Sequence, residues 1–422
     1  MAYYEIEGGH KLDGQVKISS SKNATLPILC ASVLLNGEVL IKDCPRITDV
    51  DGMCAILGDL GVKTGFFGPH LYVDTTAIND LPPSREHCEK LRASFFLTGA
   101  LLSRFKRVTM PLPGGCRIGS RPVDIHLDGF RSLGATVTEG DGLVEISLEK
   151  NRGGRVKLRY PSVGATENLI MASVFCQGSV LIENAAREPE VTDLCNFINC
   201  CGGRIYGQGT SFIRIEGVQK LNNFCTYRPI PDRIEMGTFF LATLAVGGKV
   251  CLYGVNRKNI SFLAKKYCNN SCKIYPNNVN IYSDIIYIKS RGEMRGFYRE
   301  VCAPYPLFPT DLHPILAVLF ASSRGGGRIS ETVFDGRFNY LYQLYKMGAR
   351  FCLDGDTVTF RGTRLAGADV CAQDLRGGAA LVVAGLKADG ITRVHSPHFI
   401  DRGYENFSSK LKGLGARINL LK

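Results

Sequence analysis

No run of 18 apolar residues occurs in the 422-residue sequence, which excludes a helix long enough to span a membrane. The first residues, MAYYEIEGGHKLDG, also lack the positive and then apolar segments of a secretory signal. Hydrophobic residues make up 45% and charged residues 21%, as in an ordinary folded protein. We therefore expect a cytoplasmic protein without a membrane span.

Common cofactor motifs are missing as well. The sequence has no P-loop, and no G-x-G-x-x-G follows a predicted strand, so a nucleotide would not be held in the commonest ways. Cys268 and Cys272 have the spacing of a ligand pair, but no second Cys or His pair completes a zinc site. The 16 cysteines lie mostly in apolar runs such as ILCASV and are interpreted as reduced core residues. We assign no metal.

Basic residues are in excess, with 51 Lys and Arg against 39 Asp and Glu, and the net charge is +12. A nucleic-acid-binding protein collects such charge in a stripe or tail with aromatic partners. Here single arginines stand beside Gly, Pro, Asp and Glu in short motifs. This distribution favours small anions in a pocket and no nucleic-acid partner. The rival, a nucleic-acid-binding protein, would have an affinity for DNA that falls steeply with salt.

The chain repeats at intervals of 67 to 77 residues, where a helix-like stretch runs into Leu-Gly-Ala or a variant and then a β-type run. The copies end at Gly61, Gly134, Gly202, Ser271, Gly348 and Gly415. Each copy opens with an alternating run such as GEVLIKDC or GSVLIENAA, which predicts a strand. The closing glycine is expected at the left-handed C′ position of a helix. The predicted fold class is therefore mixed α/β, with six repeats in two similar halves.

The length suits two domains. Two prolines in YRPIPDRIEMG interrupt the chain after the third repeat and predict a boundary near residue 230. Residues 1–21 have the pattern of strand, turn and strand and are expected to join the second half. We predict domain 1 at 22–230 and domain 2 at 1–21 plus 231–422. Residues 256–300 are interpreted as a diverged surface.

Four segments combine Gly or Pro turns with polar groups in a way that a core does not require. They are ISSSKNATLP, LPGGCRIGSRPVDIH, LFPTDLHP and FIDRGYEN. Each also has a purely structural reading, in order a Ser-capped helix start, a surface turn, a Pro-flanked cap and a loop salt bridge. Asp311, in the third segment, is an N-cap, a general base or an acceptor for a sugar hydroxyl. The sequence alone does not choose between them.

Cys116 follows two glycines and lies beside Arg117 and five residues before Arg121. Glycine lets a ligand approach the backbone, and nearby cations lower the pKa of a thiol. The thiol can serve as a nucleophile, an acid or neither, and the nearby His126 is as readily structural.

Six basic residues lie in or beside turn segments. They are Lys22, Arg92, Arg121, Arg337, Arg376 and Arg402. The planar fork of arginine binds carboxylate and phosphate through two hydrogen bonds. A substrate that carries both groups suits this set, although any one of these residues taken alone is more often a surface charge.

Together these segments resemble the UDP-N-acetylglucosamine 1-carboxyvinyltransferases, a branch of the enolpyruvyl transferases, along nearly the whole chain. The ordered matches include KNATLPIL at 22–29, PGGCRIGSRPVDIHLDG at 113–129, PSVGATEN at 161–168, FPTD at 308–311 and IDRGYE at 400–405. The resemblance implies a two-domain inside-out α/β barrel built from six β-α-β-α-β-β units. It also implies an active site in the cleft between the domains, at helix N-termini that favour anions.

The activity implied by the resemblance is transfer of the enolpyruvyl group of phosphoenolpyruvate to the 3-hydroxyl of UDP-N-acetylglucosamine, by addition and then elimination of phosphate. Cys116 would protonate C3 of phosphoenolpyruvate, and Asp311 would take the proton of the attacking hydroxyl. The reaction would need no metal or organic cofactor and would begin peptidoglycan precursor synthesis, on which cell shape and division depend. The resemblance also implies sensitivity to fosfomycin, and we expect a monomer.

The binding residues follow from the same resemblance. Phosphoenolpyruvate would be held by Lys22, Asn23, Arg121, Arg337, Arg376 and Arg402, of which Lys22 and Arg402 also act in catalysis. UDP-N-acetylglucosamine would be held by Arg92, Arg121, Pro122, Val123, Asp124, Ile125, Ser162, Val163, Gly164, Asp311 and Val333. Closure of the domains would exclude water, with the Cys116 loop as a mobile lid.

The chain departs from the family at Ser20 and Ser21, where Gly-Ala is usual, which adds side chains where backbone is expected to approach a ligand. One alternative hypothesis is a paralogue that binds the nucleotide sugar and regulates its pathway. Ser20 and Ser21 are its only support. The other rival of the same fold is 5-enolpyruvylshikimate-3-phosphate synthase. The Cys116 loop and RPVDIH argue against it.

Overall fold

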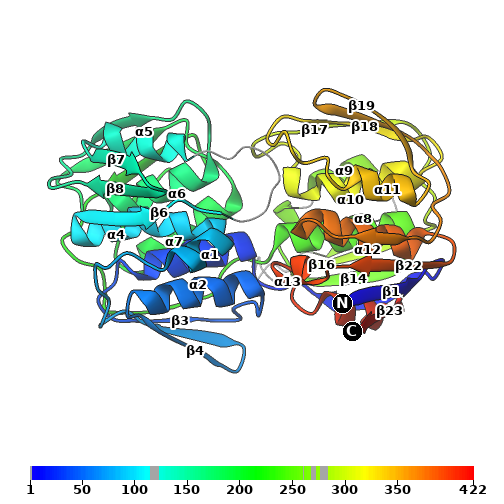
Figure 1. Cartoon of the computed structure of the whole chain (residues 1–422), viewed down its shortest axis with the longest axis horizontal. Helices are drawn as coiled ribbons and strands as arrows, with labels where there is room; N and C mark the ends of the chain where they lie inside the picture. The colour runs from blue at the N-terminus through cyan, green and yellow to red at the C-terminus, as the bar shows by residue number, and fades with distance from the viewer. Residues whose placement is uncertain (1, 115–122, 260, 268–271, 276–283) are drawn as a thin grey trace.

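The computed structural model describes residues 2–114, 123–259, 261–267, 272–275 and 284–422. All six repeat openings form strands, as predicted, and each strand lies in a different sheet (Figure 1). These strands are β3 (Glu38–Ile41), β6 (Arg107–Pro111), β10 (Ser179–Glu183), β14 (Gly248–Val255), β18 (Gly327–Glu331) and β22 (Ile391–His395). One sheet therefore corresponds to each repeat.

Three sheets belong to the first half of the chain, with strand orders β13-β3-β5-β4, β6-β8-β7 and β11-β12-β10-β9. Their other strands are β4 (Lys63–Phe67), β5 (His70–Asp74), β7 (Thr136–Gly140), β8 (Leu143–Ser147), β9 (Gly154–Lys157), β11 (Arg204–Tyr206), β12 (Phe212–Glu216) and β13 (Phe224–Tyr227). The last strand, β13, runs parallel to β3, with Cys225 opposite Val39, and so joins the third repeat to the first.

The other three sheets have the orders β21-β22-β1-β23, β15-β16-β14-β2 and β17-β18-β20-β19. Their further strands are β1 (Tyr3–Glu7), β2 (Leu12–Lys17), β15 (Cys272–Tyr275), β16 (Asp284–Ser290), β17 (Tyr298–Cys302), β19 (Arg350–Asp354), β20 (Thr357–Arg361), β21 (Asp369–Cys371) and β23 (Arg417–Leu421). Strand β1 pairs antiparallel with β22 and β23, and β2 pairs parallel with β14. The strands β1 and β2, within the predicted segment 1–21, thus join the sheets of the second half.

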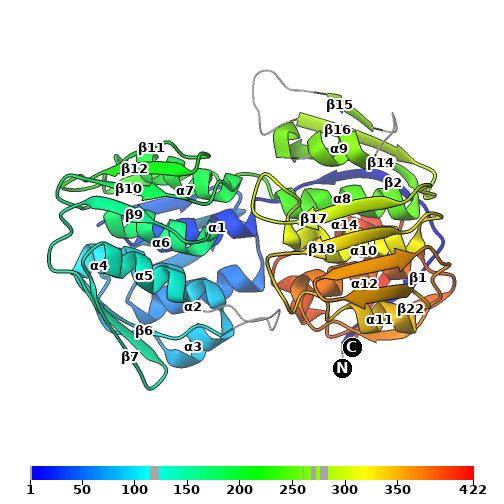
Figure 2. The same ribbon diagram turned by 90° about the horizontal axis from the view of Figure 1, so that it is seen from above.

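Helices fill the inside of each half, and the sheets lie outside them (Figures 1 and 2). The innermost are α1 (Lys22–Ser32), α4 (Leu97–Phe105) and α6 (Val163–Ser173) in the first half, and α8 (Arg233–Val246), α10 (His313–Ser322) and α12 (Leu375–Lys387) in the second. Most of their residues are buried, as expected of helices enclosed on nearly all sides. In α8, for example, every residue from Ile234 to Val246 is buried.

The remaining helices are shorter or have an exposed side. They are α2 (Thr48–Asp59), α3 (Arg85–Lys90), α5 (Asp124–Ser132), α7 (Pro189–Cys200), α9 (Ser261–Tyr267), α11 (Leu341–Lys346), α13 (His398–Asp401), α14 (Phe407–Gly413) and the 3-10 turns η1 (Arg92–Phe96), η2 (Arg257–Asn259) and η3 (Thr310–Leu312). No helix in the described part of the chain is long and apolar enough to cross a membrane.

The glycines that close the repeats have the left-handed backbone expected of them. Their φ angles are 84° at Gly61, 91° at Gly134, 95° at Gly202, 86° at Gly348 and 84° at Gly415. Ser271, which takes this place in the fourth repeat, lies outside the described residues. The glycine prediction is therefore confirmed for five of the six copies.

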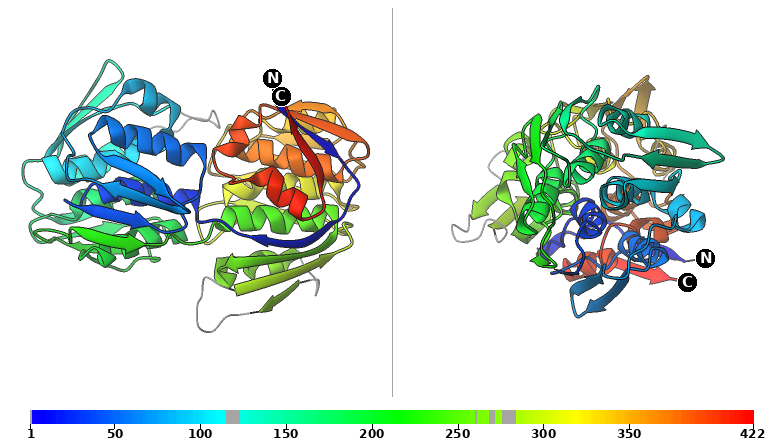
Figure 3. Two further views of the ribbon diagram at one scale, coloured as in Figure 1. Left: turned by 90° about the horizontal axis from the view of Figure 1, so that it is seen from below. Right: turned by 90° about the vertical axis from the view of Figure 1, so that its left-hand side faces the viewer.

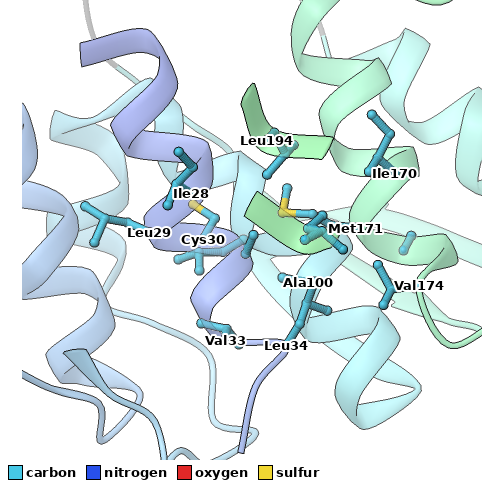
Figure 4. Packing of buried hydrophobic residues seen from close by; sticks show 14 of the residues in the cluster. Ile28, Leu29, Cys30, Val33, Leu34, Ala100, Ile170, Met171, Val174 and Leu194 are labelled. Atoms are coloured by element: carbon cyan, nitrogen blue, oxygen red, sulfur yellow. The ribbon is translucent and has the colours of Figure 1, made fainter. Parts of the chain in front are cut away.

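Buried apolar side chains form two separate clusters. One runs from Ala24 to Ile230, and the other combines Tyr4 to Ile18 with Ile234 to Ile418. Figure 4 shows part of the first cluster, where Ile28 and Cys30 of α1 lie near Met171 of α6 and Leu194 of α7. We propose that the clusters are the cores of the two predicted domains, 22–230 and 1–21 plus 231–422.

The chain passes between the two clusters twice, and the two passages lie side by side. Ser20 pairs with Pro231 in an antiparallel bridge, Ser21 N donates to Ile230 O at 2.7 Å, and Asp232 N donates to Ser19 O at 2.9 Å. Figure 3 shows the two chain ends close together on the half that holds β1 and β23. The connection between the halves is thus a short two-stranded link.

Asp193 of α7 fixes the segment that leads into this link. Its carboxylate accepts a hydrogen bond from the Tyr227 hydroxyl at 2.6 Å and another from Ile230 N at 3.0 Å. Burial raises the pKa of Asp193 to about 7, although these two hydrogen bonds lower it. The folded protein therefore holds a proton here at pH values where the unfolded chain has lost it.

A carboxyl pKa that is higher in the folded state contributes stability that is full below the unfolded pKa and is lost as pH rises through the folded pKa. We expect Asp193→Asn to remove this loss, because the amide does not ionise. The melting temperature of the variant relative to wild type should then rise between about pH 4 and pH 7. Thermal unfolding across that range tests this, with the exposed Glu149→Gln as control. A difference from wild type that is the same at every pH would contradict it.

Candidate active site

A cavity of about 580 Å³ lies where helices of both halves begin. Its wall includes the first residues of five helical segments, namely Lys22 and Asn23 of α1, Val163 and Gly164 of α6, Arg233 and Ile234 of α8, Thr310 and Asp311 of η3, and Leu375 and Arg376 of α12. Unpaired N–H groups and the positive ends of helix dipoles gather at such places. The cavity therefore favours a negatively charged ligand before any side chain is counted.

Polar caps fix where these helices begin. Ser21 accepts from Ala24 N and Ser162 from Ala165 N, both at 3.3 Å. Asp232 accepts from Ile234 N at 2.7 Å, and Asp374 accepts from Arg376 N at 3.0 Å. The structural reading of the Ser-rich start is thus confirmed for Ser21, which is buried and caps α1.

The structure brings most of the predicted site residues together in this wall. They are Lys22, Asn23, Arg92, Val123, Asp124, Ile125, Ser162, Val163, Gly164, Asp311, Val333, Arg337, Arg376 and Arg402. Cys116, Arg121 and Pro122 lie outside the described residues, as does the predicted lid. Positions from 22 to 402 in the sequence therefore meet in one cavity.

Asp311 binds two of the predicted arginines. Its carboxylate lies 2.5 Å from Nη2 of Arg337 and 3.1 Å from Nη2 of Arg376, and Nδ2 of Asn23 lies 3.5 Å away. Burial alone would raise the pKa of Asp311, but Arg376, Arg337 and Lys22 together bring it far below its usual range. Asp311 is thus a carboxylate held by cations and does not cap a helix.

Asp49, near the start of α2, is a site residue that the sequence analysis missed. Its Oδ2 lies 2.6 Å from Nζ of Lys22, and its Oδ1 accepts from Nε of Arg402 at 2.7 Å. Burial would raise the pKa of Asp49, but Lys22 and Arg402 outweigh it and the net shift is downward. An acidic residue in the first turn of a helix is common, so the sequence pattern had no feature to single it out.

Glu331, at the end of β18, is a second residue that the sequence analysis missed. It binds residues on both sides of Asp311 in the sequence. Its Oε2 accepts from Thr310 Oγ1 at 2.8 Å and lies 2.9 Å from Nδ1 of His313. Its Oε1 accepts from the backbone N–H groups of Val333 at 2.9 Å and Phe334 at 3.3 Å. One buried carboxylate therefore fixes Val333 relative to the residues on either side of Asp311.

Cys302, His313 and Glu331 also form a group whose ligand atoms lie within 4.8 Å of one another, the spacing of a metal site. All three are buried. The oxygens of Glu331 already accept hydrogen bonds from side chains and backbone, which leaves little room for a cation. We interpret the group as a hydrogen-bond network.

Three acidic residues of the first half also reach the cavity, and the sequence analysis missed them too. Glu190 binds Nε of Arg233 at 2.8 Å, and Glu188 accepts from Tyr305 N at 3.2 Å, so both link the two halves. Burial, and then Glu190 and Glu188, raise the pKa of Glu167 well above its usual range. Burial and the two neighbouring carboxylates therefore favour the neutral acid form of Glu167 over its carboxylate.

Comparison with known proteins gives consistent matches over the whole chain. A family described as EPSP synthase (3-phosphoshikimate 1-carboxyvinyltransferase) matches residues 6–411. UDP-N-acetylglucosamine 1-carboxyvinyltransferase 2 from Carboxydothermus hydrogenoformans is 42% identical, with 99% of each chain covered. The protein of that name from Bacillus subtilis is 38% identical, with 99% of this chain and 96% of that one covered.

Two solved structures show the same fold at lower sequence identity. The enolpyruvyl transferase NikO from Streptomyces tendae has a TM-score of 0.87 at 23% identity and covers 99% of this chain and 98% of its own. EPSP synthase from Acinetobacter baumannii has a TM-score of 0.73 at 16% identity, with both chains covered completely.

The Glu331 network allows a test of stability. In Glu331→Gln an NH2 group replaces one of the two carboxylate oxygens. This NH2 group must face a group that also donates a hydrogen bond, so a buried donor loses its acceptor. We expect the free energy of unfolding to fall by about 1–3 kcal/mol. Urea unfolding measures this, with Asp354→Asn, an exposed carboxylate of the same sheet, as the control. Equal stability of the two variants would contradict the role of Glu331.

Proposed function

The chain belongs to the UDP-N-acetylglucosamine 1-carboxyvinyltransferase branch of the EPSP synthase family, and from this membership we propose that it transfers the enolpyruvyl group of phosphoenolpyruvate to the 3-hydroxyl of UDP-N-acetylglucosamine and releases phosphate. The fold is the inside-out α/β barrel of six repeats that the sequence predicts. We further propose that the enzyme is a cytoplasmic monomer, that it begins peptidoglycan precursor synthesis and that fosfomycin inhibits it.

One observation carries the proposal, namely that two carboxylates, the buried Asp49 and the partly exposed Asp311, hold four cationic side chains around a single cavity. Asp49 binds Lys22 and Arg402, and Asp311 binds Arg337 and Arg376. Phosphoenolpyruvate carries a phosphate and a carboxylate, and cations are the groups that bind both. Lys22 and Arg402, on one side, suit the phosphate whose charge grows as it leaves.

The proposed reaction assigns a proton transfer to each of two residues. Cys116 gives a proton to C3 of phosphoenolpyruvate, and the 3-hydroxyl oxygen of the sugar bonds to C2 while Asp311 takes the hydroxyl proton. The tetrahedral product then loses phosphate from C2, and the Cys116 thiolate takes back a proton from C3, which restores the double bond and the thiol. Until phosphate departs, the substrates and the two side chains exchange only protons, so the net charge in the cavity does not change.

Asp311 is a weak base as long as Arg337 and Arg376 hold it, because they keep its pKa far below neutrality. The anionic groups of phosphoenolpyruvate compete for the same two guanidinium groups. When they bind, Asp311 loses part of this stabilisation and its pKa rises. Binding of phosphoenolpyruvate would thereby activate the base for the sugar hydroxyl.

The nucleotide sugar has a suitable place at the start of α6. Ser162, Val163 and Gly164 present N–H groups that suit a diphosphate. A Cβ on Gly164 would lie 2.8 Å from the Phe96 ring and 3.0 Å from the His126 ring, so the close packing here requires glycine. This constraint keeps the helix start open to a ligand.

Two rivals have less support. The shikimate-type enzyme has the same fold, but its solved representative is only 16% identical, whereas the nucleotide-sugar enzymes reach 42%. The second rival hypothesis, a regulatory paralogue, was supported only by Ser20 and Ser21. Ser21 caps α1, and neither serine is among the described residues that line the cavity, so this support is weak.

The first test is phosphate release from phosphoenolpyruvate with and without UDP-N-acetylglucosamine. We expect release only when the nucleotide sugar is present, and we expect it to fall at least about 10²-fold in Cys116→Ala, which lacks the proposed acid. Exchange of the sugar for shikimate 3-phosphate distinguishes the rival enzyme. No release from folded wild-type protein with either acceptor would reject the transferase proposal.

The second test separates the proposed base from simple binding. Asp311→Asn removes a base but also frees Arg337 and Arg376 from their carboxylate partner. We expect kcat to fall by about 10²–10⁴-fold while KM for phosphoenolpyruvate does not rise. Steady-state kinetics beside the Asp354→Asn control measure both values. An unchanged kcat with a raised KM would instead make Asp311 a binding residue.

A further inference from the structure

Two cysteine thiols meet at the far end of α7 from the cavity. Sγ of Cys225 in β13 lies 3.7 Å from Sγ of Cys200, the last residue of α7. Cys200 is exposed, and Cys225 is 4% exposed. Glu190, which lines the cavity, is ten residues before Cys200 on the same helix, or about 15 Å along its axis. The thiol pair is therefore separate from the proposed active site.

We propose that Cys200 and Cys225 form a reversible intramolecular disulfide when the protein meets a hydroperoxide, and that this pair is an oxidation site of the enzyme. The backbone already holds the two segments together, since Asn222 N donates to the carbonyl of Cys201 at 2.8 Å. Asp193 holds the same segment to α7 at Tyr227 and Ile230. A disulfide needs sulfurs about 2 Å apart, and rotation of the exposed Cys200 side chain can supply much of that approach.

The chemistry needs one hydroperoxide molecule for each disulfide. The thiolate sulfur of Cys225 attacks a peroxide oxygen, the O–O bond breaks, and the departing oxygen leaves as water, or as an alcohol, after it takes a proton. The sulfur of Cys200 then attacks the sulfenic sulfur of Cys225, the S–O bond breaks, and a second molecule of water leaves. The two sulfurs together lose two electrons, and the peroxide gains them.

The surroundings favour Cys225 as the attacking sulfur. Cys201 beside it, and then Cys200, lower the pKa of the Cys225 thiol to about 7, although burial raises it. A lowered pKa increases the ionised fraction of this thiol, and the thiolate is the reactive form. In a reducing cytoplasm the pair would stay reduced, so the disulfide would form only under oxidative stress.

The test is a peptide map of the intact enzyme after titration with hydrogen peroxide. Free thiols are blocked with N-ethylmaleimide, and trypsin then releases residues 188–204, which carry Cys195, Cys200 and Cys201, and residues 221–233, which carry Cys225. We expect a linked pair of these two peptides that dithiothreitol separates. We also expect the exposed Cys352 to remain outside any intramolecular link.

Matched variants decide which sulfur is used. The linked pair should disappear in Cys200→Ser and persist in Cys201→Ser, and both variants should keep the basal activity in reducing buffer. Cys200→Ser is an exposed change that leaves the core intact, so a loss of the link in it is not a loss of fold. Two findings would each overturn the proposal, namely no linked pair in wild type when Cys352 is already oxidised, or a link that survives in Cys200→Ser.

Discussion

Cationic side chains from both halves of the chain can share one buried cavity only because carboxylates stand between them. Without Asp49, Lys22 and Arg402 would face each other with unbalanced charge, and without Asp311 the same would hold for Arg337 and Arg376. Removal of one partner from a buried ion pair leaves the other charge uncompensated, at a cost of about 3–5 kcal/mol. The two aspartates thus hold the cavity in a form that suits an anion.

The architecture explains why the site lies where helices begin. Each half encloses helices that are apolar along their length, as in α8 and α12, so only their ends can hold polar groups that meet solvent. Because the six repeats have equivalent helices at equivalent positions, helix N-termini from distant parts of the sequence lie together at the cavity. Each cap, such as Ser162 or Asp374, satisfies part of a helix start and leaves other N–H groups for a ligand.

Sequence reasoning identified the repeats because strand alternation and the closing glycine are local features, and Gly61 and Gly415 have the backbone that it predicted. It found Lys22, Arg92, Arg337, Arg376 and Arg402 because each stands in or beside a short turn motif, but it did not find Arg233, which also lines the cavity. It missed Asp49, Glu331 and Glu190, because the role of each depends on binding partners that are distant in the sequence. Glu331, for example, is defined by Thr310 and His313, about 20 residues away and on other elements. No local pattern separates such a carboxylate from an ordinary one.

The contacts that join the halves involve the groups that a substrate would engage. Arg402 of the second half binds Asp49 of the first, and Arg233 binds Glu190, while the covalent link near Ser20 and Pro231 is only two strands wide. A ligand that takes over part of the charge on Lys22 or Arg402 therefore also changes what holds the halves together. The same ion pairs thus take part both in the proposed binding of an anion and in the contact between the halves.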